Sequence, residues 1–145
     1  MEIGMKSTDE LMHEIVDSEQ PDYFFQENQD EFRDLSLSAF LKSMLQSYGV
    51  TKAELFRKAG QSGSNYAYEL FRNDKKAPSR DILLTLCLAF PMTIEETQTA
   101  LRCAGLSVLY PRDKRDAYIM FALKNKMSIE ALDELLEKQC LKTFI

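Results

Sequence analysis

The sequence predicts an all-α protein folded as a compact helical bundle. Three observations support this prediction. Glycine and proline are scarce, with five Gly and four Pro in 145 residues, which disfavours a turn-rich β fold. Apolar residues recur at spacings of three, four and seven, as they do on one face of a helix. Several of these stretches begin with a Ser or Thr that is followed three residues later by Glu, the pattern of a helix capping box.

Residues 1–35 form an acidic arm that we expect to contain two helices. The first, over residues 7–17, begins with a capping box, and the second, shorter one follows over residues 22–34. The arm holds eleven acidic residues and two basic ones, a net charge of −9. Its second helix carries four aromatic residues, Tyr23, Phe24, Phe25 and Phe32. These either dock on the main body as additional core or belong to an arm that binds a partner or inhibits the protein.

Residues 36–105 form a second segment, and its pattern predicts five helices: 36–48, 51–59, 64–73, 80–90 and 93–104. Gly49 ends the first of them, and Thr51 with Glu54 caps the second. A turn rich in Gly and Ser separates the second helix from the third, and a basic loop with Pro78 precedes the fourth. The fourth helix is so apolar that we expect it at the centre of the fold.

The last segment, residues 106–145, adds a final pair of helices over 114–124 and 128–139. Its apolar residues either complete the core of the monomer or form the interface of a homodimer. They are Ala117, Ile119, Met120, Phe121, Ile129, Leu132, Leu135, Leu136, Leu141, Phe144 and Ile145. The stretch MSIEALDELL, from Met127, is similar to MTIEETQTAL, from Met92, 35 residues earlier. This similarity indicates either a duplicated helical pair or only the general appearance of capped amphipathic helices.

The sequence offers little for catalysis, metal binding or membrane insertion. It has one histidine, His13, and three widely spaced cysteines, Cys87, Cys103 and Cys140, so we expect no zinc site. It contains no glycine-rich phosphate loop and no nucleophile elbow, so we expect neither an enzyme nor a cofactor. No apolar run approaches the roughly 20 residues of a membrane span, and the N-terminus does not resemble a secretory signal. We therefore expect a cytoplasmic protein with reduced thiols.

A basic island lies between residues 51 and 80. Seven basic residues there outnumber three acidic ones, for a net charge of +4, although the whole chain carries −5. At physiological salt, exposed charges more than about 8 Å apart are largely screened from each other. The island can therefore meet a phosphate backbone even though the chain as a whole is acidic.

Two short helices joined by a turn with Gly60 are typical of a helix-turn-helix, whose second helix enters the major groove of DNA. In VTKAELFRKAG (50–60), YELFRND (68–74) and KKAPSRDILLTLCLAF (75–90), the chain resembles the lambda repressor/Cro-like, or XRE-type, DNA-binding family. The resemblance covers about residues 36–105. The remaining segment is similar to the C-terminal extension of a poorly characterised bacterial subgroup. The resemblance implies a transcriptional regulator with a helix-turn-helix core.

The helix over residues 64–73 would be the one that reads DNA. If Ala67, Leu70 and Phe71 face inward, polar side chains of its first turns point outward, where base contacts occur in this geometry. An Asn at such a position suits a bidentate contact with adenine. The predicted base-contacting residues are Ser64, Asn65, Tyr68 and Glu69. For Tyr68, as for Tyr66, packing against the preceding helix is the alternative.

Phosphate contacts would position the protein without reading sequence. The helix that begins at Thr51 can offer backbone N–H groups to a phosphate, and cations around the turn can hold its neighbours. The predicted phosphate-contacting residues are Thr51, Lys52, Arg72, Lys75, Lys76 and Arg80. For each basic residue taken alone, a solvated surface position is the alternative.

The sequence thus predicts a sequence-specific regulator that binds double-stranded DNA. Members of this class usually dimerise, since one half-site rarely gives enough affinity, and the last segment offers one candidate interface for a homodimer. One alternative is a protein-interaction adaptor that keeps the helix-turn-helix scaffold without binding DNA. Another is a regulator masked by its acidic arm until a protein partner uncovers it. The arm's charge of −9, the acidic Glu69 and a turn one residue longer than usual motivate both alternatives.

Overall fold

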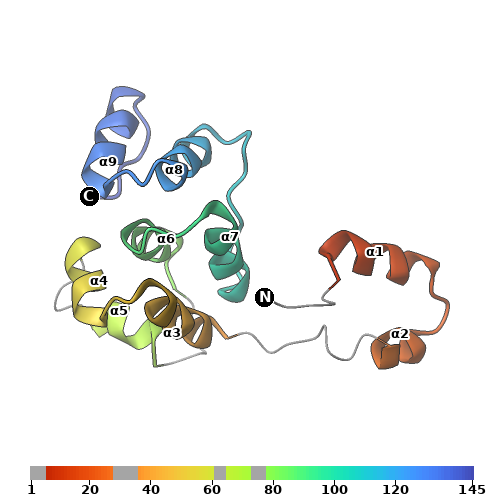
Figure 1. The fold of residues 1–145 in the computed structure, drawn as a ribbon. Coiled ribbons are helices and arrows are strands. Elements are labelled where there is room, and N and C mark those ends of the chain that lie inside the picture. Colours follow the sequence, from red (N-terminus) through yellow and green to blue (C-terminus); the bar gives the residue numbers. More distant parts are fainter. Residues whose placement is uncertain (1–5, 28–35, 61–64, 73–77) are drawn as a thin grey trace. The chain divides into compact units, whose positions relative to one another are not determined.

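The structure, a computed structural model, describes residues 6–27, 36–60, 65–72 and 78–145. Every regular element in these ranges is a helix, which confirms the predicted all-α class (Figure 1). The chain divides into two compact units, Met1–Asp34 and Leu35–Ile145. The helical pair expected at the C-terminus therefore belongs to the same unit as the candidate helix-turn-helix.

The first unit contains α1 (Thr8–Asp17) and α2 (Pro21–Glu27). The Ser7 hydroxyl caps α1 by accepting a hydrogen bond from the Glu10 amide, 3.1 Å away. Helix α2 begins one residue earlier than expected, because proline suits the first helical position, where its missing N–H is not needed. Beyond residue 27, the expected helix lies outside the described residues.

The second unit begins with α3 (Leu37–Tyr48), α4 (Lys52–Lys58) and α5 (Asn65–Leu70). Gly49, with φ of 63°, closes α3 in the left-handed conformation that glycine adopts without steric cost. Helix α5 is shorter than the expected helix over 64–73. At its end the amides of Phe71 and Arg72 bond carbonyls three residues back, 3.1 and 3.0 Å away, so the last turn is tight.

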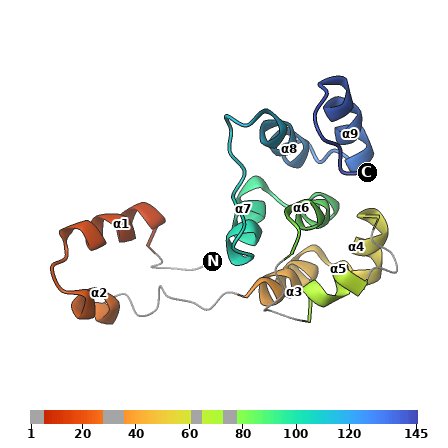
Figure 2. The same cartoon turned by 180° about the vertical axis from the view of Figure 1, so that it is seen from behind.

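Four helices complete the second unit: α6 (Arg80–Ala89), α7 (Ile94–Cys103), α8 (Lys114–Lys124) and α9 (Ile129–Lys138). Every residue of α6 from Leu83 to Ala89 is buried, and the helix contacts α4, α7 and α9. Both views place α6 between the α3–α5 group and the α8–α9 pair (Figures 1 and 2). The apolar composition of this helix is thus matched by a central position in the core.

Helices α6–α7 and α8–α9 form two similar hairpins, offset by 35 residues and called here the two copies. Thr93 and Ser128 cap the second helix of each copy, and a left-handed residue follows it, Gly105 (φ 70°) or Cys140 (φ 55°). Identical residues occupy equivalent places in the pairs 80/115, 81/116, 88/123, 92/127, 94/129, 95/130, 101/136 and 106/141. The correspondence extends well beyond the similarity visible at Met92 and Met127, and it favours a duplicated helical pair.

Two reciprocal ion pairs join the hairpins at equivalent positions. The Arg80 guanidinium donates to both carboxylate oxygens of Asp116, at 3.1 and 3.0 Å. The Arg115 guanidinium donates to both oxygens of Asp81, at 3.0 and 3.1 Å. Each arginine therefore binds the aspartate of the other copy through a planar, bidentate contact.

Each arginine also binds the extended tail of its own hairpin. The Nε of Arg80 donates to the carbonyl of Ser107 at 3.0 Å, and that of Arg115 donates to the carbonyl of Lys142, 35 residues later, at 2.8 Å. Reciprocal contacts of this kind are the mark of two-fold symmetry, in which position i meets j and j meets i. In Figure 1, α6 and α8, and likewise α7 and α9, lie on opposite sides of a common centre, as a half-turn would place them.

The buried member of these ion pairs is Asp116, whose side chain is 8% exposed. We expect Asp116→Asn to lower the free energy of unfolding by about 2–4 kcal/mol, because it leaves the Arg80 charge without its partner. Urea denaturation measures this loss. The matched control is Glu134→Gln on exposed surface, which should change stability by less than about 0.5 kcal/mol. Equal stability of the two variants would contradict the structural role of the pair.

The second ion pair predicts a defined pH dependence. Partial burial acts to raise the pKa of Asp81, but the cations of Arg115 and Lys142 outweigh it and hold that pKa below its usual value. Its stabilising contribution is thus present above the unfolded pKa of about 4 and is lost as pH falls through the lower folded value. We expect the stability advantage of the wild type over Asp81→Asn to shrink as urea unfolding is repeated from pH 7 towards pH 2. An advantage that stays constant would contradict this assignment.

Candidate nucleic-acid interface

Helix α5 presents a polar ridge on its outer side. Ala67 and Leu70, together with Phe71 just beyond the helix, are buried, with exposed fractions of 1% or less. At 100° per residue, Asn65, Glu69 and Arg72 lie on the opposite side. Asn65 and Arg72 are exposed and Glu69 is half-buried. These three residues form what we call the α5 ridge.

Aromatic packing fixes α5 against α4. The Tyr68 ring stands edge-on to Phe56, with ring centroids 4.5 Å apart, and Phe56 in turn packs against Phe71 at 5.6 Å. Tyr68 is half-buried in this arrangement. The Tyr68 ring therefore packs against the preceding helix, which was the alternative to a base contact. Tyr68 lies beside the α5 ridge and is not one of its residues.

A second tyrosine ties α5 to the following helix. The hydroxyl of Tyr66 accepts a hydrogen bond from the backbone N–H of Ser79, the residue whose side chain caps α6. Pro78, directly before it, is buried. The orientation of α5 is thus set from both sides, by α4 through Phe56 and by the start of α6 through Ser79.

Thr51 and Lys52 stand at the start of α4. The Thr51 hydroxyl caps the helix by accepting from the Glu54 amide at 3.2 Å, so its side chain already has a structural role. The Lys52 ammonium lies over the Phe71 ring, 5.4 Å from the centroid, a cation–π contact. Lys52 is half-buried, with its charge beside the end of α5.

Arg80 has an intramolecular role where the sequence indicated a phosphate contact. Its guanidinium donates to both oxygens of Asp116 and to the carbonyls of Ser107 and Val108. The position in the basic island suggested a phosphate contact, but the partners of Arg80 are 27 to 36 residues away in sequence. We therefore leave Arg80 out of the proposed interface.

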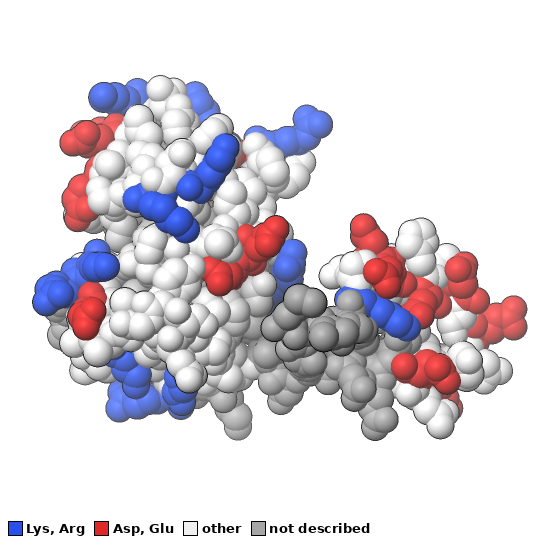
Figure 3. All heavy atoms as spheres, viewed as in Figure 1, with Lys and Arg blue, Asp and Glu red and all other residues white. Residues whose placement is uncertain are grey.

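Three predicted contact residues, Ser64, Lys75 and Lys76, lie outside the described residues. The structure adds three exposed cations that the sequence assignment did not include: Lys42 on α3 and Arg57 and Lys58 at the end of α4. Figure 3 shows basic side chains beside α4 and beneath α5 and α3, while acidic side chains dominate the α1–α2 unit. The excess of basic residues between 51 and 80 was the signal that pointed to Arg57 and Lys58.

Two further titratable groups in the described part of the chain have strongly raised pKa values. Burial raises the pKa of the Cys87 thiol to about 12, which makes it unreactive. Burial and a hydrogen bond to Glu96 raise the pKa of Tyr48 to about 12. Within the same ranges, no group of three or more His, Cys, Asp or Glu could hold a metal ion, and no helix is long and apolar enough to cross a membrane.

No protein-family model matches the chain, and neither a curated protein nor a solved structure is significantly similar to it.

Two substitutions at Tyr68 separate its packing from its hydroxyl. Tyr68→Ala removes the edge-on contact with Phe56 and should lower the free energy of unfolding by about 2 kcal/mol. Tyr68→Phe keeps the ring and should change stability by less than about 0.5 kcal/mol. Urea denaturation followed by circular dichroism measures both. A large loss for Tyr68→Phe would show that the hydroxyl, and not the ring, holds α5.

Proposed function

We propose that the protein is a sequence-specific regulator that binds double-stranded DNA through a helix-turn-helix formed by α4 and α5. The observation that supports this most directly is the α5 ridge, in which Asn65 on the helix and Arg72 just after it are exposed. Ala67, Leu70 and Phe71 anchor this segment from behind. A short anchored helix with polar residues on its outer side is what major-groove reading requires.

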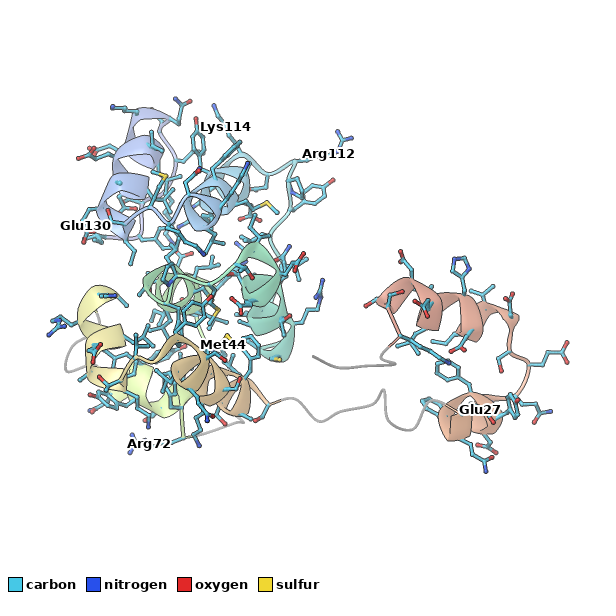
Figure 4. The ribbon with its side chains drawn as sticks, in the orientation of Figure 1. Glu27, Met44, Arg72, Arg112, Lys114 and Glu130 are labelled. Carbon is cyan, nitrogen blue, oxygen red and sulfur yellow. The ribbon has the colours of Figure 1, made fainter. Side chains whose placement is uncertain are left out.

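The residues of the ridge have complementary roles in this proposal. Asn65 stands at the first position of α5, where a bidentate contact with adenine discriminates between bases. Arg72 follows the last turn of the helix, and its exposed side chain points away from the ribbon (Figure 4). Glu69 lies between them and would accept from cytosine, while excluding other bases by repulsion.

Positioning on the backbone would come from cations around the ridge. Lys52, held over Phe71, and Arg72 are the described members of this set. Lys75 and Lys76, which follow in the sequence and lie outside the described residues, are its further proposed members. About four phosphate contacts give a slope of log affinity against log salt near −4. We expect a mobility-shift titration over salt, with a selected DNA site, to give a slope of this size. Absence of binding even at low salt would overturn the proposal.

Two substitutions distinguish reading from positioning. Asn65→Ala should relax the preference at a single base position by about 1–3 kcal/mol. Arg72→Ala should weaken binding to all sequences alike and reduce the salt slope by about one. The matched control is Arg112→Ala, also exposed but far from Arg72 in the same unit (Figure 4). A control that weakens binding as much as Arg72→Ala would show that general charge, and not the ridge, is responsible.

A protein-interaction adaptor is the second candidate, and the first unit favours it. In residues 6–27, Phe24 alone is buried, whereas Ile15, Val16 and Tyr23 are 54%, 74% and 62% exposed. Exposed apolar groups surrounded by polar residues are typical of a surface that binds a protein partner.

Removal of residues 1–35 separates the candidates. If the regulator acts unmasked, the truncated and complete chains should bind DNA with affinities within about threefold of each other, since exposed charges are screened beyond about 8 Å. Binding by the truncated chain alone would instead establish the masked form. If neither chain binds DNA at low salt, the adaptor is the remaining function.

A further inference from the structure

The first helices of the two hairpins differ in burial: every residue of α6 from Leu83 to Ala89 is buried, whereas α8 leaves Phe121 exposed. Leu86 on α6 is fully buried, with no exposed surface. Its counterpart 35 residues later on α8, Phe121, is 59% exposed. The two positions are equivalent in the repeat, so the same place on the helix is covered in one copy and open in the other.

Phe121 is the centre of an open face on α8. Spacings of three, four and seven put Lys114, Ala117, Tyr118 and Lys124 on the same side of the helix as Phe121. These five residues form what we call the α8 face. Ala117 and Tyr118 are half-buried, and the two lysines are exposed. Ile119, Ala122 and Leu123, on the other side, are buried in the core.

The composition of α8 indicates that this face is normally covered. A helix that carries apolar residues on both sides is usually buried on both sides, because only one apolar stripe is needed to hold it to a core. Helix α4, outside the two hairpins, packs against α6, the first helix of the first hairpin. Across residues 36–60, 65–72 and 78–145, nothing covers Phe121 in a comparable way. A helix that packs on α8 as α4 packs on α6 would supply this cover.

The charges on the α8 face select the chemistry of that helix. Lys114 and Lys124 stand at its two ends; the Lys114 ammonium reaches Gln139 at 3.0 Å, and both side chains are exposed. A two-fold dimer through this face would bring lysines of both copies together, which opposes association. A helix with acidic residues beside its apolar stripe would instead gain from both the ring and the two cations.

We propose that the α8 face is a docking site for an acidic amphipathic helix of a partner protein. Phe121 and Tyr118 contact the apolar stripe of that helix, and Lys114 and Lys124 pair with carboxylates along its edges. This site lies on the second hairpin and does not depend on the proposed DNA-binding function.

The test uses the full chain and a defined probe. The probe is a fluorescent peptide of about 18 residues, long enough to form a helix, with leucines spaced by three and four and glutamates on both flanks. A matched peptide carries lysines in place of the glutamates. We expect fluorescence anisotropy to show saturable binding of the acidic peptide and at least about tenfold weaker binding of the basic one.

Two variants assign the binding to the α8 face. Phe121→Glu should weaken binding of the acidic peptide by at least about tenfold, equal to about 1.4 kcal/mol. Ile145→Glu, at another exposed apolar side chain, should leave the affinity for this peptide unchanged. The double substitution Lys114→Glu with Lys124→Glu should reverse the preference between the two peptides. Because all of these side chains are exposed, circular dichroism should show the same helical content and the same unfolding midpoint as for the wild type.

Several results would overturn the proposal. They are no saturable binding of the acidic peptide, equal binding of both peptides, or full binding by a folded Phe121→Glu variant. Sedimentation of the full chain provides an independent check. A dimer that Phe121→Glu converts to a monomer would show that a second copy, and not an acidic helix, covers the face.

Discussion

The reciprocal pairing of Arg80 with Asp116 and of Arg115 with Asp81 is the interaction on which the second unit depends. Each guanidinium uses its Nη groups for the aspartate of the other hairpin and its Nε for the tail of its own. Only a planar group with several fixed donors can make both contacts at once. Two helical hairpins are thereby locked together at their starting residues.

This lock also determines where the α5 ridge stands. Arg80 is the first residue of α6, and Ser79 before it donates its amide to the hydroxyl of Tyr66 on α5. On the other side, the Tyr68 ring packs edge-on against Phe56 of α4. A helix of six residues is too short to be stable alone. Packing against α4 and the start of α6 therefore fixes the position of α5. The geometry of the proposed contacts with DNA depends in turn on the hairpin that begins with α6.

Much of the fold could be predicted from the sequence because helix limits are local. The caps at Ser7, Thr51 and Ser128 lie within three residues of the amides they satisfy, so a short window contains the whole interaction. The candidate site was less predictable. The sequence indicated Asn65 from helical spacing and Arg72 from the basic island. It also assigned Arg80 to phosphate, because its aspartate partner is 36 residues away and no local pattern reveals it. The Arg-Asp pair occurs twice in the sequence, at 80–81 and 115–116. Only the tertiary structure shows that each arginine pairs with the aspartate of the other hairpin.

The sequence by itself determined the all-α class, the approximate limits of most helices in the described ranges, and the segregation of acidic and basic residues. These properties follow from composition or from contacts within a few helical turns. Only the tertiary structure decided which cations remain available to a partner, which tyrosines are packed, and that two hairpins meet across a half-turn. The reason is that each of these depends on pairs of side chains far apart in sequence, as in Arg80 with Asp116 and Tyr66 with Ser79. Their meeting is fixed by the packing of the whole unit and not by local preference.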